Sequence, residues 1–315
     1  MTKYLVTGGA GFIGSHVVDS LVASGKRVRV VDNLSTGKKE NLIQHGPSVV
    51  EFIEADLVDS GVVADAVDGV DCVVHIAAIP SVPRSVKDPT ASHLVNVDAT
   101  LLLLEAARAA QVSRFVFASS SSVYGDSSIL PKHEEMLPNP LSPYALQKLI
   151  GEQYLRLFSS LYGLDTVALR FFNVFGPRQD PDSPYSGVIS LFTAALSAGR
   201  QPKIYADGEQ TRDFTYVSDV VAAVVAASTA PGVSGKVINV ACGGRVSVND
   251  LFNTLRDVMG VDVDPIYQPP RAGDVRDSQA DNTLAKQLLG FRTMVTVEEG
   301  LRRTVDWYRT SLATD

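Results

Sequence analysis

The first half of the chain alternates short apolar runs with longer stretches in which apolar residues recur every three or four positions. The short runs are typical of buried parallel strands, and we predict such strands at residues 4–7, 27–31, 51–54, 72–76, 114–118 and 166–170. The longer stretches predict helices at residues 12–23, 91–111 and 143–162. Strands and helices that alternate in this order build a parallel sheet with helices on both faces. The predicted fold class is therefore α/β, a doubly wound Rossmann-type parallel sheet.

The pattern becomes less regular in the second half. Proline, glycine, aspartate and serine cluster at residues 177–187, and further helices are predicted at residues 188–198, 219–228, 248–258 and 297–310. We predict a nucleotide-binding domain at residues 1–172 and a smaller, mixed substrate-binding domain over most of residues 173–315. Segments near residues 213–245 are expected to rejoin the first domain, because residues 237–240 form another short apolar run.

Three glycines, Gly8, Gly11 and Gly14, follow the first predicted strand and open the first predicted helix. They suit a tight turn, the close approach of the backbone to a pyrophosphate, and close packing of the helix on the strand. The helix N-terminus then offers free N–H groups to phosphate oxygens. Asp32 follows the second strand, where an acid accepts hydrogen bonds from an adenosine ribose and repels a 2′-phosphate. The combination predicts a site for NAD rather than NADP.

Tyr144 and Lys148 are four residues apart in the predicted helix 143–162, so they share one face of that helix. A free tyrosine has a pKa of about 10 and is a poor base near neutral pH. A neighbouring ammonium group and the positive nicotinamide ring of NAD⁺ would both lower that pKa. A serine run, 119–122, follows the preceding strand, at the edge where doubly wound sheets place their sites. The sequence therefore predicts acid–base chemistry around Tyr144.

These motifs resemble the extended branch of the short-chain dehydrogenase/reductase superfamily over essentially the whole chain, from Tyr4 to about Tyr308. Within that branch the chain is most similar to the UDP-hexose 4-epimerases, especially bacterial enzymes that act on UDP-N-acetylglucosamine or UDP-glucose. Those enzymes carry Ser or Thr three residues before a Val-Tyr-Gly motif, a position that Ser120 holds here. Sugar-nucleotide dehydratases carry Thr-Asp-Glu before the same motif, whereas this chain has Ser121 and Ser122.

The resemblance implies the NAD-dependent 4-epimerisation of a UDP-hexose through a transient 4-keto intermediate. NAD would be tightly bound and regenerated in each turnover. The catalytic residues would be Tyr144, which takes the proton of the sugar 4-hydroxyl, Ser120, which relays or orients it, and Lys148, which stabilises the phenolate.

The binding residues are likewise implied by the resemblance. The residues expected to contact NAD are Gly8, Gly11, Phe12, Ile13, Gly14, Asp32, Asn33, Ser35, Gly37, Asp56, Leu57, Ala77, Ala78, Tyr144, Lys148 and Phe171. The residues expected to contact the UDP-sugar are Ser81, Ser120, Ser121, Ser122, Tyr144, Asn173, Val188, Tyr205, Arg212, Arg271, Asp274 and Ser278. Both arginines suit a diphosphate, because a planar guanidinium pairs with two oxygens.

Several alternatives stay open. A UDP-glucuronate 4-epimerase would need only a few extra donors, which the serine run could supply. A dehydratase is disfavoured by Ser121 and Ser122, an NADPH-dependent reductase by Asp32, and a non-catalytic NAD-binding protein by the intact catalytic set. Ser278 stands where glucose-restricted epimerases carry a bulky tyrosine, which favours a 2-N-acetyl sugar. Pro80 stands where similar enzymes have glycine, which leaves the preferred hexose undecided.

Composition and charge narrow the range of partners. The net charge of −7 disfavours extended, non-specific contact with nucleic acid or anionic membranes. No apolar run has the roughly 18 residues that span a bilayer, and the first residues do not resemble a signal peptide, so we expect a cytoplasmic protein. Two cysteines are too few for a four-cysteine zinc site, His16, His45, His93 and His133 show no metal-ligand spacing, and no metal is expected. The resemblance implies a homodimer in which helices 91–111 and 143–162 form a four-helix bundle with a second subunit.

Overall fold

The computed structural model describes residues 2–180, 187–270 and 275–312, so Arg271 and Asp274 lie outside the described residues. A seven-stranded parallel sheet in the order β11-β6-β5-β4-β1-β2-β3 forms its centre. The strands are β1 (Lys3–Thr7), β2 (Arg27–Asp32), β3 (Val50–Glu54), β4 (Cys72–His75), β5 (Arg114–Ser120), β6 (Thr166–Phe171) and β11 (Lys236–Val240). The predicted fold class is confirmed. The chain adds β2 and β3 on one side of β1 and then β4, β5 and β6 on the other, and doubly wound sheets bind their ligands at this switch in strand order, between β1 and β4.

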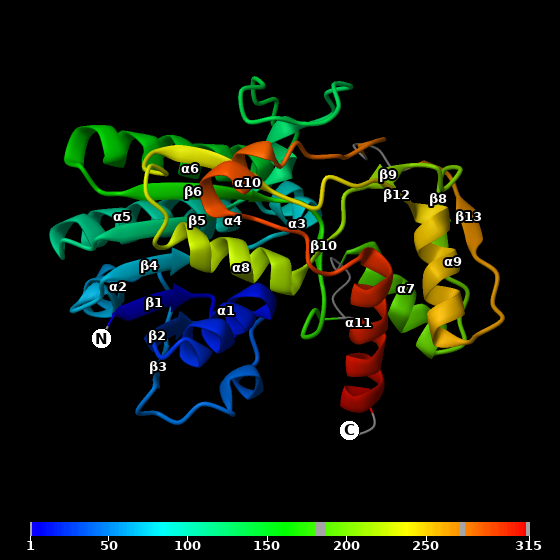
Figure 1. The fold of residues 1–315 in the computed structure, drawn as a ribbon, viewed down its shortest axis with the longest axis horizontal. Coiled ribbons are helices and arrows are strands. Elements are labelled where there is room, and N and C mark those ends of the chain that lie inside the picture. The colour runs from blue at the N-terminus through cyan, green and yellow to red at the C-terminus, as the bar shows by residue number, and fades with distance from the viewer. Residues whose placement is uncertain (1, 181–186, 271–274, 313–315) are drawn as a thin grey trace.

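Helices cover both faces of the sheet (Figure 1). On one face lie α1 (Phe12–Ala23) and α8 (Val217–Ala227), and on the other lie α2 (Ser60–Val67), α5 (Ala99–Ala109) and α6 (Pro143–Tyr162). Side chains alternate along each strand, so Tyr4 and Val6 of β1 pack in the core under α1, and Leu5 packs in the core under α5. Both faces are buried, which explains why the strands read as continuous apolar runs.

The helix predicted at 91–111 is not one regular helix, and that prediction was wrong in its detail. The segment consists of α4 (Pro89–His93), a π-helical stretch (Leu94–Asp98) and α5. Asn96 in the π-helical stretch accepts a hydrogen bond from the Ile79 amide at 2.8 Å and donates to Gln147 Oε1 of α6 at 2.8 Å. These tertiary contacts hold the wider turn, which periodicity in the sequence does not report.

The remaining elements lie mostly beyond the carboxyl edge of the sheet, at the right of Figure 1. The short strands there form three pairs: β7 (Val174–Phe175) with β10 (Thr215–Tyr216), β8 (Lys203–Tyr205) with β13 (Ile266–Gln268), and β9 (Thr211–Arg212) with β12 (Val246–Ser247). The other helices are α3 (Val82–Lys87), α7 (Val188–Ser197), α9 (Val248–Met259), α10 (Thr283–Leu289) and α11 (Val297–Leu312), with 3-10 turns at Lys39–Leu42 and Ser121–Tyr124. β11 pairs with β6 in the main sheet, while the division at residues 172 and 173 stays a prediction.

Over the described residues, every helix is too short or too polar to cross a membrane. In the same part of the chain, no three or more His, Cys, Asp and Glu side chains gather so that they could hold a metal ion.

Candidate active site

The glycine turn after β1 leaves the start of α1 open. A Cβ atom on Gly8, whose φ is +67°, would lie 2.8 Å from the Ala77 amide nitrogen, and one on Gly14 would lie 2.1 Å from the Gly8 carbonyl oxygen. Only glycine fits at both positions. Gly11 begins α1 without a side-chain hydrogen bond to its first turn in the described structure. The first-turn N–H groups, which include those of Phe12 and Ile13, therefore suit phosphate oxygens.

Asp32 is buried where β2 ends, beside that turn. Its carboxylate accepts hydrogen bonds from the Ala10 amide at 3.0 Å and the Leu34 amide at 2.9 Å. A Cβ on Gly37 would come within 2.9 Å of both carboxylate oxygens, so the loop passes directly over Asp32. A nucleoside needs such close backbone approach, and the arrangement fits the predicted ribose site.

The neighbouring predicted contacts gather around the same strand ends. Asn33 donates to Asp56 Oδ2 at 2.9 Å and accepts from the Ser35 amide at 3.0 Å. Ala77 donates its amide to Thr7 Oγ1 at 3.3 Å, which ties the segment after β4 to the glycine turn. Leu57 and Phe171 are buried, and Ala78 is half-buried. The structure therefore brings the predicted NAD residues to the carboxyl edge of the sheet.

The predicted catalytic residues meet where α6 passes the end of β5. Ser142 caps α6 by accepting from the Ala145 amide at 3.1 Å, and the Tyr144 amide donates to Ser85 Oγ at 3.0 Å. The Tyr144 hydroxyl is hydrogen-bonded to Ser120. Lys148 donates from Nζ to the Ala118 carbonyl at 2.7 Å and lies 6.0 Å from the centre of the Tyr144 ring.

Burial shifts both titrating groups of this set toward their neutral forms. It raises the pKa of Tyr144 to about 12, against the lowering effect of the hydrogen bond with Ser120. It lowers the pKa of Lys148 to about 7, against the raising effect of the Glu152 carboxylate. Lys148 therefore titrates near neutral pH, and its charged form favours the phenolate of Tyr144.

The serine run differs in its contacts from one residue to the next. Ser120 Oγ accepts from the Ser122 amide at 3.2 Å and so caps the 3-10 turn that follows β5. Ser122 Oγ is buried and has no hydrogen-bond partner within the described structure, while Ser121 is half-buried. A buried hydroxyl normally has a partner, so Ser122 suits a polar ligand group.

Several predicted substrate residues lie together beyond the sheet edge. Asn173, with φ +32°, donates to the Asp213 carbonyl at 3.2 Å, and Arg212 donates to the Thr211 carbonyl at 2.9 Å. The Ser278 amide donates to the same Thr211 carbonyl at 3.1 Å, which places residues 212 and 278 side by side.

The other predicted substrate residues lie where helices and strands start or end. Val188 begins α7 and Tyr205 ends β8. Ser81 is buried and its hydroxyl caps α3 by accepting from the Arg84 amide at 3.2 Å. Ser81 therefore stabilises the start of α3, and its predicted contact with a sugar would be a second role.

Two buried residues of the site were missed from the sequence. Asp213 accepts from the Gly243 and Ala280 amides, each at 3.0 Å, and burial raises its pKa to about 7. Its side chain therefore joins its own segment to those that carry Gly243 and Ala280. The only signal for it was its place in the predicted Arg212-Asp213-Phe214 motif, where we expected the neighbouring arginine to matter.

The second missed residue is His75, which links the glycine turn to the π-helical stretch. Its Nδ1 lies 2.7 Å from Thr7 Oγ1 and its Nε2 lies 2.9 Å from Thr100 Oγ1, which itself donates to the Asn96 carbonyl. Thr100 must therefore accept from Nε2–H, and Nδ1 must accept from Thr7. Burial lowers the pKa of His75 to about 3, so it is a neutral, structural link. A polar residue inside an apolar strand is the signal that could have indicated it.

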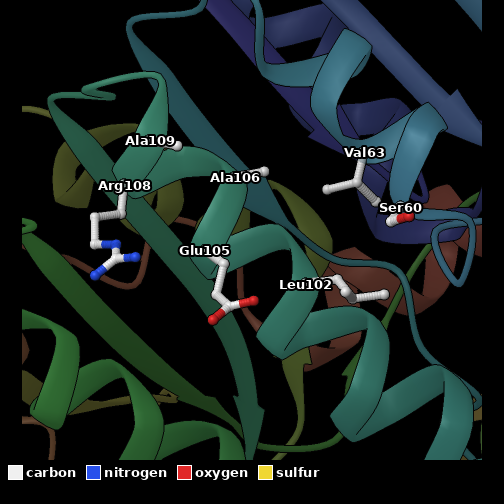
Figure 2. Close-up of a pocket in the computed structure, with 7 residues that line it drawn as sticks. All are labelled: Ser60, Val63, Leu102, Glu105, Ala106, Arg108 and Ala109. Carbon is white, nitrogen blue, oxygen red and sulfur yellow. The ribbon is translucent and has the colours of Figure 1, made fainter.

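The depression drawn in Figure 2 lies elsewhere, on the outer surface between α2 and α5. Its lining residues are Ser60, Val63, Leu102, Glu105, Ala106, Arg108 and Ala109. None of these is a predicted site residue, so the depression is separate from the candidate active site.

Known proteins are similar to this chain in sequence and in fold. The family described as NAD dependent epimerase/dehydratase matches residues 4–241. The chain belongs to this family. Membership confirms the resemblance on which the predicted residues rest, while the role of each residue stays a prediction.

Individual relatives are similar over their whole length. The UDP-glucose 4-epimerase of Mycolicibacterium smegmatis is 44% identical over 312 residues, 98% of each chain. The solved UDP-N-acetylglucosamine 4-epimerase of Methanobrevibacter ruminantium, in complex with UDP-N-acetylmuramic acid, is 42% identical, with a TM-score of 0.93 over 98% of this chain and 99% of that one. The UDP-glucose 4-epimerase of Thermus thermophilus, in complex with NAD, is 38% identical, with a TM-score of 0.88 over 98% and 99%. A UDP-glucuronate 4-epimerase is also among the relatives.

Proposed function

We propose that this protein is a UDP-hexose 4-epimerase that uses bound NAD and inverts the configuration at C4 of the sugar. The observation that carries the proposal is the meeting of Ser120, Tyr144 and Lys148 at the end of β5, on the same sheet edge as the glycine turn. The names of the similar proteins support the same reaction. The enzyme is then an isomerase, with UDP-N-acetylglucosamine, UDP-glucose or both, and their 4-epimers, as substrates.

The residues around the glycine turn fit NAD. The open start of α1 suits the pyrophosphate, and the Asp32 carboxylate suits the adenosine ribose and repels a 2′-phosphate. Bound NAD supplies a hydride acceptor and donor, so that C4 can be oxidised to a ketone and then reduced on its other face. Because the two steps cancel, no second redox substrate is required.

The chain's own residues move the proton and hold the sugar nucleotide. Tyr144 takes the proton of the 4-hydroxyl and later returns it, Ser120 orients that proton, and the Lys148 ammonium stabilises the phenolate. Arg212 and Asn173 hold the diphosphate together with Arg271, and Asp274 contacts the uridine ribose; Arg271 and Asp274 lie outside the described residues. Binding energy from the distant UDP group fixes the reacting carbon while the sugar itself stays free to turn.

The preferred hexose depends on the region around Ser278. Its small side chain leaves room for a 2-N-acetyl group, which favours UDP-N-acetylglucosamine. UDP-glucuronate is the second candidate, and the unpartnered hydroxyl of Ser122 is the donor that favours it.

One experiment tests the proposal and separates the substrates. Purified protein without added cofactor receives UDP-N-acetylglucosamine, UDP-glucose or UDP-glucuronate, and NMR follows the anomeric and H4 signals. We expect conversion of the first two to their 4-epimers. Conversion of UDP-glucose alone would exclude Ser278 as the determinant of specificity. No conversion of any of the three, with NAD supplied, would contradict the proposed function.

We also propose a cytoplasmic homodimer, without a nucleic-acid or membrane partner, that associates through α5 and α6. The support is a set of exposed apolar side chains on α6, namely Leu146, Leu157, Leu161 and Tyr162. Free cysteines, Cys72 and Cys242, fit a reducing compartment. Size-exclusion chromatography with light scattering tests the assembly: Leu157→Asp should give a monomer, and an unchanged dimer would exclude this interface.

A further inference from the structure

Glu152 is a buried carboxylate that the mechanism above does not use. It lies one helical turn beyond Lys148 and two turns beyond Tyr144 on the same face of α6, and it is 2% exposed. Its oxygens accept from Ser119 Oγ at 2.5 Å and from Arg170 Nε and Nη2 at 2.8 and 2.7 Å. We propose that Glu152 is a positioning residue for the epimerisation: it fixes the end of β5 that carries Ser120, and it places a carboxylate one helical turn from the Lys148 ammonium.

Two side chains of α6 hold the last residues of β5. Lys148 binds the carbonyl of Ala118, Glu152 binds the hydroxyl of Ser119, and Ser120 follows immediately. Residues 118 and 119 are therefore each fixed to α6, the helix that also carries Tyr144. This arrangement sets the distance between Ser120 and Tyr144, so both halves of the proton-transfer pair depend on it.

The partner of Glu152 is itself held firmly. Arg170 lies opposite Ser119 in the register of β5 and β6, and its guanidinium stacks 4.5 Å from the centre of the Tyr124 ring. Tyr124 in turn donates to Asn239 Oδ1 of β11 at 2.7 Å. The carboxylate is thus anchored through residues from three neighbouring strands.

Few ionisable side chains lie near Lys148. The ionisable side chains that surround it in the described structure are Tyr144 and Glu152 of α6, His75 of β4 and, behind Glu152, Arg170 of β6. His75 is neutral because burial lowers its pKa to about 3. Burial lowers the pKa of Lys148 to about 7, and the Glu152 charge is what opposes that shift.

The test is Glu152→Gln, which keeps an acceptor for Ser119 but removes the charge. This inference rests on the proposed function, so one readout is independent of activity: the ¹³Cε NMR signal of Lys148 in the NAD-loaded protein, assigned by its loss in Lys148→Arg. We expect its titration midpoint to fall by about one pH unit or more. The alkaline limb of the kcat/KM profile should move to lower pH by the same amount, because Lys148 loses its proton earlier.

Two further variants keep the test decisive. Glu298→Gln makes the same change in the exposed pair of Glu298 and Arg302 on α11 and should move neither readout. Glu152→Gln/Arg170→Gln leaves no unpaired buried cation, so we expect it to fold, with a fall in the Lys148 midpoint that is smaller than in Glu152→Gln because the more distant Arg170 charge is lost as well. A wild-type Lys148 midpoint in either folded Glu152 variant would overturn the inference. A wild-type protein that does not epimerise would overturn the proposed function, while the Lys148 titration would still decide the role of Glu152.

Discussion

Two ion pairs of nearly the same length lie in opposite surroundings. The pair of Arg170 and Glu152 measures 2.7 Å, and its side chains are 3% and 1% exposed. The pair of Arg245 and Asp277 measures 2.8 Å, and its side chains are 41% and 32% exposed. The first lies under the proposed catalytic residues, and the second lies beside β9, where Arg212 and Ser278 are found. The difference shows where this molecule requires fixed geometry and where it tolerates adjustment.

Because the pair of Arg170 and Glu152 is buried, water cannot take the place of either partner. Neither group can be solvated if its partner leaves, so the buried pair acts as one rigid unit with β5 and β6. Water and salt can replace either partner of the exposed pair, so the region near β9 can change its contacts at little cost. A proton-transfer site needs the first kind of support. The exposed pair lies away from the reacting atoms, where such fixed support is not required.

The largest effect is expected from Tyr144→Phe, which tests whether the rigid region carries the chemistry. Loss of the phenol should lower kcat by about 10²- to 10⁴-fold, because general acid–base groups contribute on that scale. Bound NAD and the thermal unfolding temperature should stay those of the wild type. Steady-state kinetics with NMR detection measure the loss, and wild-type turnover would contradict the role of Tyr144.

The comparison of the two pairs is tested directly by Arg170→Leu and Arg245→Leu. Arg170→Leu leaves the Glu152 charge buried and unpaired, so the free energy of unfolding should fall by about 3–5 kcal/mol. Arg245→Leu should lower it by about 0–1 kcal/mol. Urea unfolding followed by circular dichroism gives both values. Equal losses would show that burial is not what distinguishes the pairs.

Asp213 extends the comparison of the two ion pairs, because it is next to the exposed region near β9 but its own side chain is buried. Its pKa is raised to about 7 in the folded protein, so folding favours its protonated form. The resulting stability is fully present below pH 3.8, the ordinary pKa, and is lost as the pH rises through 7. Over that window the wild type should lose about 4 kcal/mol relative to Asp213→Asn. Urea unfolding at intervals from pH 4 to pH 8 measures this, and parallel curves would exclude it.

The smallest effects are expected from two matched helix caps. Ser142 caps α6 just before Tyr144, and Ser247 caps α9 by accepting from the Asp250 amide at 3.0 Å. Ser142→Ala and Ser247→Ala should each cost about 1 kcal/mol of stability. Only Ser142→Ala should also lower kcat, because it loosens the turn that carries Tyr144. The same fall in kcat for both variants would mean that general stability, not position, sets the rate.

The sequence predicted the buried sheet well. The six predicted strands all occur within two residues of the expected bounds, and α1 and α6 have the expected bounds at both ends. Strong local signals explain this success: α6 begins after Ser142, with Pro143 at its first position, and ends at Gly163, whose φ is +69°. The helices α2, α3 and α10 also have such end signals, namely Asp59, Ser81 and Gly290, but they are six to eight residues long, too short for a clear apolar period, and were missed.

The candidate site was predictable where a motif marks it and not where packing makes it. The Tyr144 and Lys148 pair and the three glycines are visible as spacings. Glu152 continues the same spacing of four, but a glutamate on a helix is nearly always exposed, so nothing in the sequence indicates its burial. Its role depends on Arg170 and Ser119, which come from two other elements.

The helix α6 serves two purposes with its two sides. One side presents Tyr144, Lys148 and Glu152 to the sheet, and the other exposes apolar residues such as Leu146 and Leu157. Adding one residue to a helix rotates everything beyond it by about 100°. An inserted residue after Lys148 would therefore turn Glu152 away from Arg170 and turn Leu157 away from the exposed side, while Leu146 would keep its place. A change in the length of this helix thus disturbs both of its sides at once, whereas a change of one side chain disturbs only one of them.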